Sequence, residues 1–82
     1  MRTVLERRVG CYKITFFTID GERCGFKVKR FNTRKKTWTT VCVVTPENKS
    51  VIAICLPKYV EKAINDIARV IEAYYGLKVT LV

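Results

Sequence analysis

The chain has 82 residues, of which 49% are hydrophobic, and this predicts a single domain, residues 1–82, with one hydrophobic core. No apolar run approaches the roughly 18 to 20 residues of a membrane span, and the first residues lack a signal-peptide apolar region, so we expect a soluble, cytoplasmic protein. The formal net charge is +9, and residues 1–36 hold eleven of the sixteen Lys and Arg against three acids, which favours a polyanionic partner.

The sequence has no Gln, no His and one Met beside abundant Lys, Arg, Ile and Val, a bias met in proteins of thermophiles. Its four cysteines, Cys11, Cys24, Cys42 and Cys55, lie 13, 18 and 13 positions apart. Without a C-x2-C pair or a His, we expect no metal site and no cofactor. Each cysteine falls in an expected strand, as a small buried hydrophobic residue or as part of one or two disulfides.

A β-hairpin is predicted near the N-terminus. Residues 9–19 are rich in aromatic and β-branched residues, and residues 24–31 alternate apolar with polar side chains. The turn is either Asp20-Gly21 alone or a three-residue loop, 19–21, with Gly21 in the left-handed conformation. We favour the longer loop because it gathers the apolar residues of both strands on one face. These residues are Tyr12, Ile14, Phe16, Cys24, Phe26 and Val28.

The opposite face of this hairpin is basic. In the favoured register it carries Lys13, Thr15, Phe17, Arg23, Lys27 and Lys29. With the two-residue turn, Tyr12 and Phe16 would replace Phe17 on the lysine face. Basic residues and at least one aromatic ring therefore share a surface in both registers.

The rest of the sheet follows a basic connection. Residues 31–36 include three consecutive cations, Arg34, Lys35 and Lys36, which we expect on a flexible arm at the sheet edge. Residues 37–44 resume the strand pattern with Trp38 at their start, residues 45–50 form a turn, and residues 51–56 form a short apolar strand. A four-stranded antiparallel meander is predicted.

One amphipathic helix and a last strand complete the chain. Pro57 suits the first helical position and Gly76 a stop, which gives about five turns. Its apolar stripe is Val60, Ile64, Ile67, Ile71 and Tyr74. The stripe either covers the sheet or forms a dimer interface with a partner helix. Residues 77–82 alternate again and are expected at the edge of this sheet or of a second subunit, so the fold class is α+β with the order ββββαβ.

With one sheet face closed by the helix, the other is the candidate nucleic-acid interface. Its expected residues are Lys13, Phe17, Arg23, Lys27, Lys29, Arg30, Arg34, Lys35, Lys36 and Trp38. Lys and Arg neutralise phosphates, and unpaired bases stack on aromatic rings for roughly 1 to 3 kcal/mol each. A plainer interpretation makes the cations a solvated face that blocks edge aggregation, and Phe17 and Trp38 core or dimer contacts.

A family resemblance rests on residues 52–60, Ile-Ala-Ile-Cys-Leu-Pro-Lys-Tyr-Val, which lead into the helix after four strands. This arrangement resembles the positive-cofactor-four-like family of single-stranded-DNA-binding transcription coactivators, over residues 8–75. The resemblance implies a homodimer built on the helices, whose sheets offer basic and aromatic residues to DNA, here Lys27, Lys29 and Arg30. In two departures, Val60 or a neighbour stands where the family's helix usually has Trp, and residues 77–82 are outside the family pattern.

The sequence predicts a binder of nucleic acid and not an enzyme, because it lacks His, paired carboxylates and a glycine-rich phosphate loop. We expect non-specific binding of single-stranded DNA, or RNA, by a homodimer that is cytoplasmic or nucleoid-associated. The alternative is a regulator that docks its cationic sheet on an acidic protein. A small basic ribonuclease is a third reading, and transcription, replication, packaging and RNA handling would all use the same physics.

Overall fold

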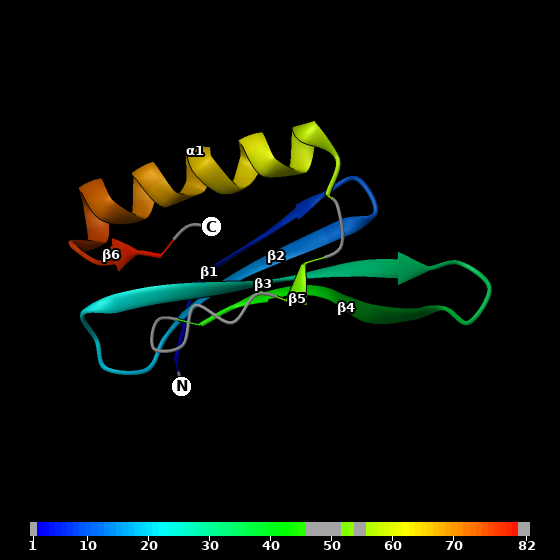
Figure 1. Ribbon diagram of the computed structural model, residues 1–82, viewed down its shortest axis with the longest axis horizontal. Coiled ribbons are helices and arrows are strands. Elements are labelled where there is room, and N and C mark those ends of the chain that lie inside the picture. Colours follow the sequence, from blue (N-terminus) through cyan, green and yellow to red (C-terminus); the bar gives the residue numbers. More distant parts are fainter. Residues whose placement is uncertain (1, 46–51, 54–55, 81–82) are drawn as a thin grey trace.

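The computed structural model describes residues 2–45, 52–53 and 56–80 as a sheet with one helix across it (Figure 1). Its elements are β1 (Arg2–Val9), β2 (Tyr12–Thr18), β3 (Arg23–Asn32), β4 (Thr37–Val44), β5 (Ile52–Ala53), α1 (Lys58–Tyr75) and β6 (Lys78–Val79). Strands β1 to β4 form an antiparallel meander, and the helix and a short C-terminal strand follow. The predicted α+β class with the order ββββαβ is confirmed for the four meander strands, the helix and the last strand, and the two-residue β5 is added between β4 and α1.

The meander begins one strand earlier than predicted. The expected strand 9–19 is divided at Gly10, whose φ of 60° is left-handed, and β1 runs back along the whole of β2. Strand β1 was not predicted because charged residues interrupt its apolar pattern. A register shift between Thr3 and Leu5 breaks the alternation further. Of the expected strand 51–56, Ile52–Ala53 pairs with β4 and Leu56 lies outside any strand, while residues 51, 54 and 55 are outside the described residues.

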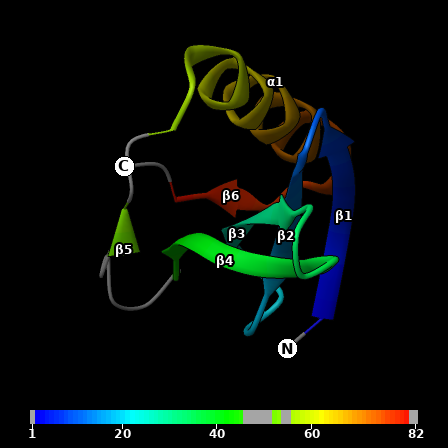
Figure 2. The ribbon, with the colours of Figure 1, turned by 90° about the vertical axis from the view of Figure 1, so that its right-hand side faces the viewer.

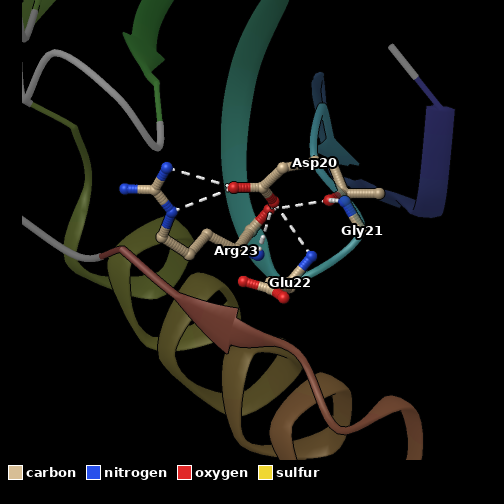
Figure 3. A network of polar contacts seen from close by, with 5 residues as sticks. Asp20, Gly21, Glu22 and Arg23 are labelled. Carbon is tan, nitrogen blue, oxygen red and sulfur yellow. Dashed lines mark hydrogen bonds and ion pairs between the residues drawn. The ribbon is translucent and has the colours of Figure 1, made fainter.

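The β2–β3 hairpin has the predicted faces but a longer loop. Residues 19–22 separate the strands, and Phe16 lies opposite Phe26 rather than Cys24, where the three-residue loop would have put it. Gly21 is left-handed, with φ of 79°, as predicted. The added residue lets Asp20 accept hydrogen bonds from two later backbone N–H groups of the turn (Figure 3).

The C-terminal strand β6 joins this sheet beside the start of β3. The last β3–β4 pair is Phe26 with Val44, so the preceding residues of β3 are open on that side. There β6 pairs parallel to β3, and the N–H of Lys78 donates to the carbonyl of Glu22 at 3.0 Å. The expected strand 77–82 therefore extends its own sheet, although residues 81–82 are outside the described residues.

Helix α1 lies across one face of the sheet (Figures 1 and 2). It begins one residue later than predicted, with Pro57 as its N-cap, and it ends as predicted at Gly76, whose φ is 66°. The stripe residues Val60, Ile64, Ile67 and Ile71 are at most 5% exposed and pack in the core of their own chain. The dimer interface predicted for these four residues is therefore wrong, because the sheet already covers them. Tyr74 is 84% exposed and lies outside this core.

The cysteines divide into two environments. Cys24 and Cys42 are buried free thiols of the core, where burial raises the pKa of both. They are small buried hydrophobic residues, one of the two roles predicted. Cys11 is free and exposed between β1 and β2, contrary to the expected strand position, and Cys55 is outside the described residues. Within residues 2–45, 52–53 and 56–80, no helix has both the length and the apolarity to cross a membrane.

Candidate nucleic-acid interface

The sheet face turned away from α1 is called the open face below. Residues directly opposite each other in an antiparallel pair point to the same side, so the strand register gives its members. They are Thr3, Glu6 and Arg8 of β1, Lys13, Thr15 and Phe17 of β2, Gly25, Lys27, Lys29 and Phe31 of β3, and Trp38, Thr40 and Val43 of β4. Cations of three neighbouring strands thus share one surface.

Three of these cations form a row across the sheet. Lys13 lies directly opposite Arg8 on one side and directly opposite Lys29 on the other. Neighbouring strands are about 4.8 Å apart, and like charges in this arrangement repel each other. Arg8 is exposed, while Lys13 and Lys29 are half-buried. An anion placed over this cationic row would relieve the repulsion.

Trp38 lies at one end of the open face, in contact with two of the same cations. The Lys13 ammonium nitrogen is 4.4 Å and the Arg8 guanidinium carbon 5.5 Å from the centroid of its ring. The Phe31 ring meets it edge-on, with centroids 5.2 Å apart. The twist of the sheet, visible where β1 stands upright beside the transverse β4 in Figure 2, is consistent with this approach of β1 and β2 side chains to a β4 residue. We call Arg8, Lys13, Phe31 and Trp38 the tryptophan cluster.

The carboxylate of the open face has a hydroxyl partner. The Thr15 hydroxyl donates to Oε2 of Glu6 at 3.1 Å. Thr15 also lies directly opposite Lys27 on the neighbouring strand. Among the described residues there is one ion pair, which joins Arg23 to Asp20 at 3.1 Å. Within the described residues, Lys27 and the three cations of the row therefore have no ion-pair partner.

The structure does not support a stacking role for Phe17. Its side chain is on the open face, as predicted, but only 4% exposed. It lies directly opposite Gly25, which has no side chain and so leaves room for the ring. A nucleic-acid base cannot stack on a ring that solvent hardly reaches, so the predicted role is wrong.

Two predicted arginines are not part of the cationic row. Arg23 is the first residue of β3, directly after the β2–β3 turn, and Asp20 of that turn binds its guanidinium group and offsets its charge (Figure 3). Arg30 is opposite Tyr12 and Thr39, and therefore on the helix side of the sheet. Because side chains alternate along a strand, Lys29 and Arg30 cannot both point to the open face.

The three cations of the β3–β4 turn are exposed, as expected. Their turn is ordered by Asn32, whose side-chain oxygen accepts the N–H of Arg34 at 3.0 Å and of Lys35 at 3.2 Å. Lys36 adopts a left-handed φ of 53°. This hydrogen-bonded turn places Arg34, Lys35 and Lys36 at the end of the sheet near Trp38, in place of the expected flexible arm.

The sequence did not point to two residues of the candidate interface, Arg8 and Phe31. Arg8 was missed because β1 was not predicted as a strand. The signal that could have found it is Gly10, which separates two runs of strand-forming residues. Phe31 is the last residue of the predicted strand 24–31 and the first of the predicted connection 31–36, and it was not named for the interface, although it continues the alternation of Lys27 and Lys29. Comparisons of the chain with protein-family models, with curated proteins and with solved structures find no match.

Proposed function

We propose that the protein binds single-stranded nucleic acid, with DNA favoured, through its open face. The observation that carries the proposal is the cationic row. Lys13 lies in register between Arg8 and Lys29, and no carboxylate of the described residues forms an ion pair with any of the three. Among the described open-face residues, Glu6 is the one carboxylate beside Arg8, Lys13, Lys27 and Lys29, whereas a face that served only solubility would mix the two signs more evenly.

Phosphate groups supply the anion that this row lacks. Lys27 and Lys29 are two positions apart on β3, about 6.5 to 7 Å along the strand. This spacing is close to the step between phosphates of an extended single strand, so the two ammonium groups can contact neighbouring phosphates. Each neutralised phosphate releases condensed counterions, which drives binding at low salt.

The tryptophan cluster favours a single strand over a duplex. Trp38 is half-buried and Phe31 is half-buried beside it, so both rings remain partly accessible. An unpaired base offers its face for stacking, whereas the bases of a duplex are already stacked on one another. Cations beside the ring can hold the flanking phosphates. One copy of the chain provides the whole open face, so the proposal does not depend on a homodimer.

The test is fluorescence anisotropy with labelled single-stranded DNA, RNA and duplex DNA of the same sequence over a salt series. We expect the single strands to bind more tightly than the duplex. The logarithm of the binding constant should fall linearly with the logarithm of salt concentration, with a slope of about −0.7 for each phosphate contacted. Labelled RNA should remain intact.

Two outcomes would contradict the proposal. Absence of binding at low salt would leave an acidic protein as the better partner for the same cations. Cleavage of the labelled RNA would make the protein a ribonuclease rather than a binder.

A further inference from the structure

A hollow of about 420 Å³ lies at the end of the β3–β4 hairpin. Arg30 and Thr39 form part of its lining, and they lie directly opposite each other on the helix side of the sheet. Figure 1 shows that this end of the hairpin extends past the first turn of α1, so the helix does not cover it. None of the three cations of the row lines the hollow, and the residue that the hollow shares with the tryptophan cluster is Phe31.

Its polar lining is rich in residues whose side chains carry hydrogen-bond donors. Arg30 and Arg34, whose side chains end in guanidinium groups, and Thr33 and Thr39, whose side chains carry hydroxyl groups, are among its lining residues. No Asp or Glu lines the hollow, and neither arginine takes part in an ion pair within the described residues. Two arginines thus line a shared space that no carboxylate-bearing residue of the described chain lines.

The turn beside the hollow is held in shape before any ligand binds. Asn32, which also lines it, accepts the backbone N–H groups of Arg34 and Lys35. Arg30 is fixed at its backbone by pairing with both β2 and β4. The backbone positions that carry the two arginines are therefore ordered, which lowers the entropy lost when their side chains close on a ligand.

We propose that this hollow binds a phosphate group through Arg30 and Arg34. A guanidinium group presents planar, paired N–H donors that match two oxygens of a phosphate, and a hydroxyl group can donate to a third. Phe31 and Val41 form apolar parts of the wall, and the volume is within the range of small-molecule sites. The hollow thus has room for a phosphate and part of the sugar attached to it. This assignment does not depend on binding at the open face.

The phosphate can stand on a small molecule or end a nucleic-acid strand, and four probes separate these sources. Inorganic phosphate, a nucleoside 5′-monophosphate and a short single strand with and without a 5′-phosphate are titrated into labelled protein, at constant ionic strength, while backbone amide NMR signals are followed. We expect the signals of residues 30–34 and Thr39 to shift with every phosphate-bearing probe. A larger shift with the 5′-phosphorylated strand than with the monophosphate identifies a strand end as the ligand.

The variant Arg30→Gln/Arg34→Gln should weaken phosphate binding about tenfold or more, because two charge-assisted contacts are lost. Arg30→Lys/Arg34→Lys keeps the charge but not the paired donors, and should fall between this variant and the wild type. The matched control is Lys62→Gln/Arg69→Gln, which removes the same charge from exposed positions of α1 and should change affinity less than twofold. All substituted side chains are exposed, so the fold should be retained.

The assignment is overturned if phosphate shifts signals evenly over all basic segments, or if the control variant loses as much affinity as Arg30→Gln/Arg34→Gln. Shifts confined to Lys13, Lys27 and Lys29 would also overturn it while leaving the proposed open-face function in place. Conversely, Lys27→Gln/Lys29→Gln should leave the phosphate response of the hollow unchanged, so that failure of one proposal can be told from failure of the other.

Discussion

The ammonium nitrogen of Lys13 lies 4.4 Å from the centroid of the Trp38 ring. The two residues belong to β2 and β4, with β3 between them. A cation over an indole ring is attracted by its π electrons, by about 0.5 to 2 kcal/mol depending on exposure. This contact holds together a cation and a ring that a single strand would need at adjacent points. In the proposed function, a base that stacked on this face of the ring would displace the ammonium group and leave it free for a phosphate.

Replacing Trp38 by Ala should weaken binding of single-stranded DNA by roughly 1 to 3 kcal/mol, the usual contribution of one stacked base. Duplex binding should change less, because paired bases do not stack on the ring. Anisotropy titrations of both substrates at one salt concentration measure the difference. Tyr74→Ala is the matched control, since Tyr74 is an aromatic residue 84% exposed on α1 and away from the open face. An equal loss for single strand and duplex would argue against stacking.

Replacing both Lys27 and Lys29 by Gln should weaken binding to all sequences alike, because phosphate contacts carry no sequence information. The slope of the salt dependence for a single strand should become shallower by about 1.4, which corresponds to two lost phosphate contacts. Titrations over a salt series measure this slope. Lys62→Gln/Arg69→Gln removes the same charge from α1. If it flattens the slope equally, the effect comes from net charge and not from the open face.

The sequence predicted which residues of the hairpin belong to the core better than it predicted which residues belong to the open face. Alternation along residues 24–31 was enough to place Phe26 and Val28 in the core, and Gly21 and Gly76 marked two left-handed turns. The same alternation places Lys29 and Arg30 on opposite faces of the sheet. Both were nevertheless predicted for the interface, because the prediction rested on the number of cations in the hairpin. The burial of Phe17 depends on its cross-strand neighbourhood, which local sequence does not give.

Two further features depended on tertiary structure. The apolar stripe of α1 suits a sheet and a partner helix equally well, so only the packed chain shows that its own sheet covers Ile64 and Ile67. Strand β1 is charged along much of its length and is held as a strand by its pairing with β2. The strand propensity of this segment alone did not indicate a strand, and Arg8 of the candidate interface was missed for that reason.

Phe17→Ala should act on stability rather than on binding. The ring is 4% exposed, and replacing a buried Phe by Ala typically lowers the free energy of unfolding by about 3 to 5 kcal/mol. Urea denaturation measures this loss, and anisotropy on the folded variant should give a DNA affinity within about twofold of the wild type. Phe16→Ala, in the core on the opposite face, is the comparison for a buried ring. A stable Phe17→Ala protein with weakened DNA binding would restore the stacking role.

The stability of the β2–β3 turn should depend on pH through Asp20. Its Oδ1 accepts the backbone N–H groups of Arg23 and Glu22, each at 2.9 Å, and its Oδ2 accepts Nε of Arg23 at 3.1 Å (Figure 3). These donors, led by the backbone N–H of Arg23, lower the pKa of Asp20 from its ordinary value of 3.8 to about 2.

Because the pKa is lower in the folded state, the ionised carboxylate stabilises the fold above about pH 4, and this contribution is lost as the pH falls toward 2. Asp20→Asn removes the charge at every pH. The difference between the free energies of unfolding of wild type and Asp20→Asn should therefore be largest near neutral pH and should shrink between about pH 4 and pH 2. Urea denaturation over this range measures it, with Asp66→Asn on the exposed side of α1 as the control for loss of one carboxylate. A difference that stays constant down to pH 2 would show that hydrogen bonding in the turn does not depend on the charge of Asp20.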